Sequence, residues 1–241
     1  MNNYENFNAI SDRIREGEVD DESIVRKLMQ KVYTWMAVAL AVTGLTAWYV
    51  ASSPTMLQAI FGNRIVFWGL IILEVGFVFG ISRAINRLSL TMATLLFMIY
   101  SVINGVTLSV LLLAYTLESI GSVFFITAGT FGAMAFIGYT TKTDLTKFGQ
   151  IMVMALIGLI IATVVNLFLH SSGFAMILNY LGVLIFVGLT AYDVQKLKNL
   201  FSQSGGVTEE WQKLAILGAL TLYLDFVNLF IKLLAIMGKR K

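Results

Sequence analysis

The chain has 241 residues, of which 58% are apolar and only 13% are charged, whereas soluble domains carry about 25% charged residues. A net charge of +3 is too small to indicate a nucleic-acid-binding protein, and the absence of cysteine excludes a disulfide scaffold or a thiolate metal site. This composition is that of an integral membrane protein.

The first 30 residues are polar and contain half of the fourteen acidic residues of the chain. We expect residues 1–30 to form a cytoplasmic tail, either mobile or folded as a short surface helix. Residues 31–241 are expected to form one transmembrane domain. No cleavable signal peptide is predicted, because the first apolar run is long enough to span a membrane and no small-residue cleavage site follows it.

Seven apolar runs follow, and each can cross a bilayer, since about 20 residues rising about 1.5 Å each span a core of about 30 Å. These runs lie at 31–51, 64–82, 91–113, 120–140, 148–169, 174–195 and 212–237. They are longer than the alternating strands of a membrane barrel, which have about ten residues. The sequence therefore predicts an all-α integral membrane protein, a bundle of seven transmembrane helices.

The basic residues between the runs predict a cytoplasmic N-terminus, because lysine and arginine gather on the cytoplasmic side of membrane proteins. Beyond the tail, that side would hold most of them: Arg83, Arg87, Lys142, Lys147, Lys196, Lys198 and Lys213. The opposite side would hold Arg64 and the basic C-terminus, Lys239 to Lys241. That basic C-terminus would also suit a seventh run that re-enters the membrane. We expect it to cross fully.

Glycines recur in two of the runs. Gly76 and Gly80 form a G-xxx-G pair, and Gly129, Gly132 and Gly138 repeat along the fourth run. Small residues allow helix backbones to approach closely in lipid. We therefore predict that these glycines lie at helix–helix contacts, and we assign them no chemistry.

Ionisable side chains inside the runs are candidates for function, since each costs at least about 2.5–3.5 kcal/mol at mid-bilayer. Four of the later acidic residues fall at run ends or in a loop, where water can reach them: Glu118, Asp144, Glu209 and Glu210. Glu74, Asp193 and Asp225 remain within apolar segments.

The last run carries a polar stripe. Thr221, Asp225, Asn228 and Lys232 are spaced so that they share one face of a helix. Such a face must contact protein or a water-filled cavity rather than lipid. Two interpretations stay open. Asp225 could pair with Lys232 or an arginine and fix the helix register, or it could be a titratable group that lines an ion or proton path together with Asp193.

Several segments together resemble one family. They are LYLDFVNLF at 222–230, TAYDVQ at 190–195, GYTTKTDL at 138–145, ILEV at 72–75 and NGVTL at 104–108. These segments are similar to the Bax inhibitor family, the transmembrane Bax-inhibitor-motif proteins, and particularly to its bacterial members. The resemblance covers nearly all of residues 25–237.

The resemblance implies a seven-helix fold whose last helix is central and wrapped by the other six, and a pH-sensitive leak of calcium. In that family a hydrogen-bonded aspartate pair from the last two helices senses pH, and the pair corresponds to Asp193 and Asp225. A glutamate of the same polar interior corresponds to Glu74. An arginine late in the second helix latches the pore by pairing with the aspartates. Arg83 and Arg87 are both candidates, and neither aligns cleanly.

The chemistry of such a pair follows from its surroundings. Two carboxyl groups in contact at low dielectric cannot both ionise comfortably, so they share a proton. We expect loss of this proton to cause repulsion, to recruit an arginine and to shift the last helix, whereas acid favours conduction. Calcium prefers carboxylate and carbonyl oxygens, so we expect a permeation path lined by Asp193, Asp225, Asn228 and Glu74. Transient calcium contact is expected at the two aspartates. The aspartates can meet only if the sixth helix continues past Lys198 or the last helix begins below the membrane surface.

Two other functions stay open. Buried carboxyl groups also serve in proton-coupled transport of small solutes, and the protein could instead regulate a membrane protease or cell-death machinery as a bound partner. We expect no enzyme and no cofactor, because no G-x-S-x-G, H-E-x-x-H or P-loop motif occurs. His170 ends the fifth run, where a structural role is expected. The expected partners are lipid, calcium and protons, without nucleic acid, in a bacterial inner membrane.

Overall fold

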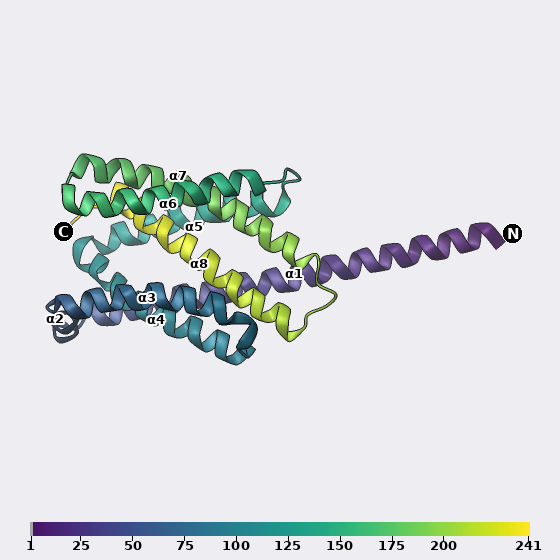
Figure 1. Cartoon of the computed structure of the whole chain (residues 1–241), viewed down its shortest axis with the longest axis horizontal. Helices are drawn as coiled ribbons and strands as arrows, with labels where there is room; N and C mark the ends of the chain where they lie inside the picture. Colours follow the sequence, from purple (N-terminus) through teal and green to yellow (C-terminus); the bar gives the residue numbers. More distant parts are fainter. Residues whose placement is uncertain (1) are drawn as a thin grey trace.

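The computed structural model describes residues 2–241, with side chains from Glu22 onward. Its helices are α1 (Asn2–Ala51), α2 (Pro54–Phe61), α3 (Arg64–Ala84), the 3-10 helix η1 (Ile85–Arg87), α4 (Leu90–Ala114), α5 (Leu117–Thr140), α6 (Thr146–Leu169), α7 (Ser172–Phe201) and α8 (Glu209–Met237). Seven of the described helices are long and apolar enough to cross a membrane. The predicted all-α bundle of seven spans is thereby confirmed (Figure 1).

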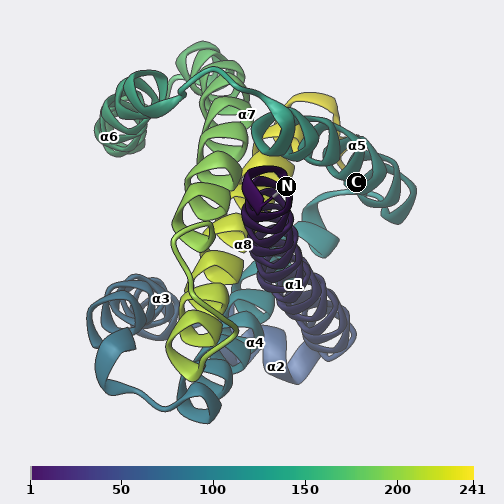
Figure 2. The same ribbon diagram turned by 90° about the vertical axis from the view of Figure 1, so that its right-hand side faces the viewer.

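The last helix, α8, is the centre of the bundle (Figures 1 and 2). It has the largest share of buried residues among the spans, 61% of its most apolar 18-residue stretch. It packs against α1, α4, α5 and α7. In α3 and α6 only 6% of the residues in the corresponding stretch are buried. Helix α3 packs mainly against α4, and α6 packs against α7. The last helix is therefore central as expected, but four helices surround it closely, and α3 and α6 form an outer layer.

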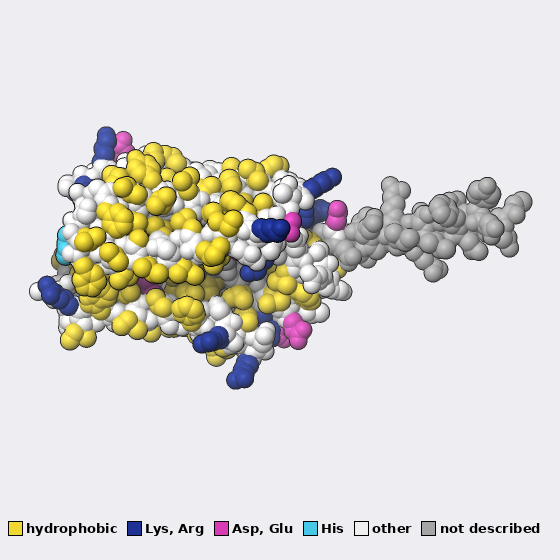
Figure 3. Space-filling model, turned by 45° about the horizontal axis from the view of Figure 1, so that its top comes forward, with side chains coloured by type: hydrophobic (Ala, Val, Ile, Leu, Met, Phe, Trp, Pro, Cys, Tyr) yellow, Lys and Arg dark blue, Asp and Glu magenta, His cyan; other side chains and the backbone are white. Residues whose placement is uncertain are grey.

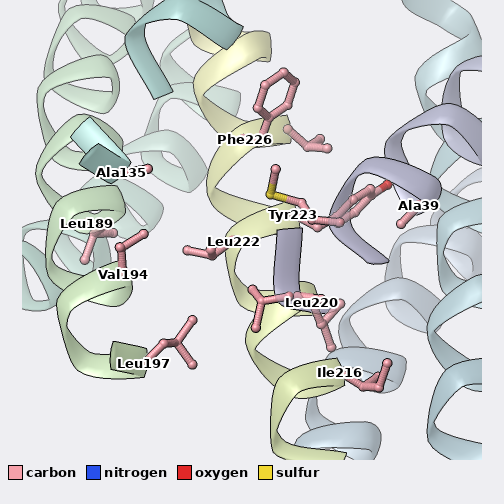
Figure 4. Close-up of a cluster of buried hydrophobic side chains, with 14 of the residues drawn as sticks. Ala39, Ala135, Leu189, Val194, Leu197, Ile216, Leu220, Leu222, Tyr223 and Phe226 are labelled. Carbon is pink, nitrogen blue, oxygen red and sulfur yellow. The ribbon is translucent and has the colours of Figure 1, made fainter. Parts of the chain in front are cut away.

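The core is built around large side chains of α8. Figure 4 shows Leu222 pointing toward α7 and Tyr223 pointing toward α1. The Tyr223 ring meets the rings of Phe97 and Tyr100 edge-on, with centroids 5.7 and 5.9 Å apart. Within a membrane such close packing holds helices together, because lipid tails are as apolar as the side chains themselves. Many large apolar side chains are exposed on the outer helices, and on the face seen in Figure 3 they cover the middle of the bundle while most charged side chains lie nearer its two ends.

The two ends of the chain lie at opposite ends of the bundle (Figure 1). Helix α8 is continuous over its whole length and is long and apolar enough to cross a membrane, without the internal turn that a re-entrant segment needs. The full crossing of the last run stays a prediction. Its basic C-terminus folds onto the connection between α4 and α5. Tyr115 pairs with Arg240 in an isolated bridge, and the Thr116 amide donates to the carbonyl oxygen of Lys239 at 3.1 Å.

Helix α1 passes through residue 30 without a break. Val25, Leu28 and Met29 are buried in the core, so α1 is already packed before the first predicted span begins. The side chains of residues 2–21 lie outside the described set. The division of the chain into a tail at 1–30 and a domain at 31–241 stays a prediction.

The prediction for the glycines is wrong at four of five positions. An added Cβ would meet nothing within 4 Å at Gly76, Gly80, Gly129 and Gly132. These glycines lie on helix faces that no neighbouring helix covers. Gly138 is the exception, since a Cβ there would collide with the backbone of Ala191 in α7. Sequence spacing identified the small residues but not the faces on which helices meet.

Candidate functional site

Asp193 of α7 and Asp225 of α8 lie in hydrogen-bonding contact. Asp225 is only 5% exposed. No N–H or hydroxyl group of the described residues reaches its Oδ2 atom, because the facing group is another carboxyl. A hydrogen bond between two carboxyl groups requires a proton on one of them. The geometry therefore suits a pair that shares one proton.

The aspartates meet because of the length and inclination of their helices. Helix α7 continues past Lys198 to Phe201, which satisfies the condition set by the sequence. Asp193 lies eight residues before the end of α7 and Asp225 lies sixteen residues after the start of α8. These separations correspond to about 12 and about 24 Å of helix. The two levels coincide because α8 runs obliquely across the bundle (Figure 1).

A cavity of about 510 Å³ lies between α6, α7 and α8. Asp193 and Asp225 line it together with Thr221, Asn228 and Lys232. The polar stripe of the last run thus faces a cavity, as expected. The opposite wall belongs to α6 and is mostly aliphatic. The structure brings these five polar residues together, and the roles assigned to them stay predictions.

Two members of the stripe are satisfied by their own helix. The Thr221 hydroxyl donates to the carbonyl oxygen of Leu217 at 3.1 Å, and the Asn228 amide donates to that of Leu224 at 2.8 Å. These bonds leave the Asn228 side-chain oxygen available. Lys232 differs, because its ammonium makes no hydrogen bond or ion pair with any described residue, Asp225 included.

Glu74 belongs to a separate polar group that lies among α1, α3, α4 and α8. Its carboxyl lies close to Asn104 and Thr107 of α4, and its buried Oε1 atom has no hydrogen-bond partner among the described residues. The Tyr223 hydroxyl donates to the Asn104 side-chain oxygen at 2.9 Å and lies 2.7 Å from the Thr43 hydroxyl. We call Asn104, Tyr223 and Thr43 the tyrosine cluster, and Glu74 lies beside it. Glu74 does not line the cavity of the aspartates, since α3 packs mainly on α4. Its role in one polar interior with the aspartates stays a prediction.

Sequence reasoning assigned no role to Thr43, Asn104 or Tyr223. The last two lie inside the segments NGVTL and LYLDFVNLF, which were informative about the family but not about contacts. A polar residue in the middle of an apolar run was the available signal, since buried hydroxyl and amide groups require partners.

The structure does not bring the candidate latch residues to the aspartates. Arg83 at the end of α3 and Arg87 in η1 are both exposed. Neither makes an ion pair with Asp193 or Asp225 among the described contacts. A latching role for either arginine stays a prediction.

His170 has the structural role expected of it. It ends α6 in the left-handed conformation with φ 52°, and its amide donates to the carbonyl oxygen of Asn166 at 2.9 Å. Its Nδ1 atom lies 3.0 Å from the carbonyl oxygen of Phe168. His170 is therefore the C-terminal cap of α6.

Seven spans, a central last helix and a carboxyl pair between the last two helices define a membrane protein of the Bax inhibitor class. The family model described as inhibitor of apoptosis-promoting Bax1 matches residues 25–241. The chain belongs to this family, which confirms the resemblance found in its sequence.

Relatives in several bacteria match over most of their length. The inner membrane protein YbhL of Escherichia coli is 49% identical over 214 residues, which cover 88% of this chain and 92% of the relative. An uncharacterized protein of Borreliella burgdorferi is 43% identical over 218 residues, covering 90% and 94% of the two chains. An uncharacterized protein of Rickettsia prowazekii is 42% identical over 225 residues, covering 92% of each chain.

Proposed function

We propose that this protein is a pH-sensitive calcium leak of a bacterial inner membrane, with a cytoplasmic N-terminus and a gate formed by Asp193 and Asp225. The observation that carries this proposal is the contact between the two carboxyl groups at the wall of the cavity between α6, α7 and α8. Loss of the shared proton changes the charge of the pair from one negative charge to two. Like charges in contact repel strongly where the dielectric constant is low, so this proton can drive a shift of α8 against α7.

The direction of the pH response follows from the same contact. With the proton present, the carboxyl groups stay bonded and no arginine is needed to neutralise them. The described arrangement, in which Arg83 and Arg87 lie away from the pair, corresponds to this protonated state, to which we assign conduction. Loss of the proton separates the carboxylates and makes the site attractive to an arginine. Acid therefore opens the leak, and rising pH closes it.

The cavity offers oxygen ligands suited to calcium as the permeating ion. It is lined by the carboxyl groups of Asp193 and Asp225 and by the side-chain amide of Asn228. A tight calcium site is built from more ligands than these, roughly six to eight oxygens of carboxylates, carbonyls and water. The described residues contain no group of three or more His, Cys, Asp or Glu side chains placed to hold a metal ion. Few protein ligands mean a weak and brief contact, which favours passage over retention.

The test measures calcium flux into proteoliposomes between pH 5 and 8, roughly the range where buried carboxyl groups titrate. We expect flux through the wild type to rise with acidity and flux through the double variant Asp193→Asn, Asp225→Asn to be independent of pH. An unchanged pH profile in the double variant would refute the mechanism.

Asp144→Asn is the matched control. Asp144 is fully exposed, and hydrogen bonds from the hydroxyl and amide of Thr146 lower the pKa of its carboxyl below the usual value. A lowered pKa keeps this carboxylate charged throughout the tested range. The control should therefore retain the wild-type profile, whereas a flattened profile in this variant would show that the assay reports general damage.

The size of the cavity favours a second candidate, proton-coupled transport of a small solute. About 510 Å³ falls within the range of roughly 300–1,000 Å³ found for small-molecule pockets. In that case the pair would relay protons. Saturable uptake of a solute that stops when the proton gradient is collapsed would favour transport, and passive calcium current without a solute would favour the leak.

A further inference from the structure

A second cavity, remote from the aspartates, lies between α1 and α5. It is a groove of about 580 Å³, and each wall is one face of a helix. Helix α1 contributes Arg26, Gln30, Tyr33 and Met36, which recur every three or four residues along that face. Helix α5 contributes an aromatic and small-residue face that ends at Tyr139.

The groove exists because the backbones of α1 and α5 stay apart along it. Gly132 lines the α5 wall and has no side chain to occupy the groove. The space beside it is open, because an added Cβ would meet nothing within 4 Å. The groove opens onto the lateral surface of the bundle, where Phe136 of its rim is 69% exposed. In a membrane this surface is bathed in lipid, so an acyl chain can enter from the side.

The chemistry of the groove changes along its length. Arg26 and Gln30 form one end, tyrosines follow, and Met36 lies at the apolar end. Ten residues separate Arg26 from Met36, or about 15 Å of helix, which is half of a hydrocarbon core of about 30 Å. Tyrosine is enriched at the membrane–water interface. The groove thus has the length and the polarity gradient of a single leaflet.

Arg26 is available to an external anion. It is exposed and makes no ion pair with any described acidic side chain, including Glu22 one turn away. Lys198 adds positive charge behind the groove, because it donates to the carbonyl oxygen of Tyr139 at 2.8 Å and lies 4.8 Å from the centre of its ring. A planar guanidinium binds phosphate through paired hydrogen bonds.

We infer that this groove binds an anionic phospholipid of the leaflet at the Arg26 end, which is the cytoplasmic leaflet in the proposed orientation. The phosphate contacts Arg26, with Gln30 and the tyrosine hydroxyls as further donors. One acyl chain lies against Gly132 and extends to Met36. The lipid fills the space between α1 and α5 and so joins two helices that otherwise scarcely touch.

Native mass spectrometry of the full chain in mild detergent tests this inference. The protein is titrated with phosphatidylglycerol or with phosphatidylcholine of the same acyl chains. Both lipids carry a phosphate that can contact Arg26, but the cationic choline of phosphatidylcholine would be repelled by the positive charge of Arg26 and Lys198. We therefore expect one phosphatidylglycerol to bind the wild type about tenfold more tightly than phosphatidylcholine. Arg26→Gln should remove that preference. Gly132→Leu should weaken both lipids, because its side chain fills the acyl site without a clash.

Two variants serve as matched controls. Lys27→Gln removes an adjacent exposed cation that does not line the groove, and Gly80→Leu adds a side chain to an open face of α3. Both should bind phosphatidylglycerol as the wild type does. Equal binding of the two lipids by the wild type, wild-type binding by Arg26→Gln, or an equal loss in Lys27→Gln would each overturn the inference.

Discussion

Two polar groups on different flanks of α8 differ in how their hydrogen bonds are met. In the tyrosine cluster the Tyr223 hydroxyl reaches both Asn104 and Thr43 at normal hydrogen-bond distances. Across the helix, Asp225 has an oxygen that no N–H or hydroxyl reaches, and it faces Asp193 beside a cavity. Tyr223 and Asp225 are two residues apart, so they project from nearly opposite sides of the same helix.

The difference separates a structural group from a responsive one. A hydroxyl that is fully hydrogen-bonded keeps one state over the physiological pH range, because tyrosine titrates only near pH 10 (roughly) even in water. A carboxyl pair can change its charge by one proton, and the adjoining cavity gives the helices room to respond. The comparison predicts that variants of the tyrosine cluster change stability without changing pH dependence, whereas variants of the aspartate pair do the reverse.

The largest effect on stability is expected from Tyr223→Ala. Tyr223 is completely buried, at 0% exposure, and its loss leaves a cavity among aromatic rings. Truncation of a buried aromatic costs about 3–5 kcal/mol, which should appear as a clear drop in the thermal unfolding temperature in detergent. If that temperature stayed within a degree or two of wild type, the central position of Tyr223 in the core would be in error.

A smaller loss of stability is expected from Tyr223→Phe, which keeps the ring and removes only the hydroxyl. Asn104 and Thr43 then lose a partner, at a cost of about 1–3 kcal/mol. The pH profile of calcium flux should remain that of the wild type. A shifted profile would show that the two groups are coupled through α8 and would break the distinction drawn between them.

The smallest effect is expected from Lys232→Gln. The Lys232 ammonium lines the cavity without an ionic partner among the described side chains. It lies seven residues, or about 10 Å, from Asp225 along the helix and repels a passing cation. Its removal should raise calcium flux a few-fold at every pH while leaving the pH midpoint in place. Lower flux, or a displaced midpoint, would mean that Lys232 acts on the pair directly and not on the passing ion.

The spans were predictable because a membrane requires about 20 apolar residues in a row. The lengths of the helices were less predictable, since hydropathy indicates which residues lie in the lipid core and not where a helix ends. Residues 196–201 contain Lys196 and Lys198 and still continue α7. The short helix α2 was missed because its eight residues are too few to form an apolar run.

The candidate site shows the same division. Spacing of three and four residues placed Thr221, Asp225, Asn228 and Lys232 on one face, because that depends only on the geometry of a single helix. Contacts between helices depend on packing, which one sequence does not specify. Glu74 was for this reason assigned to the aspartates although its neighbours are on α4, and the exposed faces around Gly76 and Gly80 were taken for contacts.

The position of α8 has a consequence for how the protein is made. It follows α1, α4, α5 and α7 in the chain and is therefore made after them, yet all four pack on it. Until it inserts, Thr43, Asn104 and Asp193 lack the side chains that meet them in the finished bundle. The earlier helices therefore cannot complete the core until α8 has been made, and a chain truncated before α8 would leave these polar side chains without their partners.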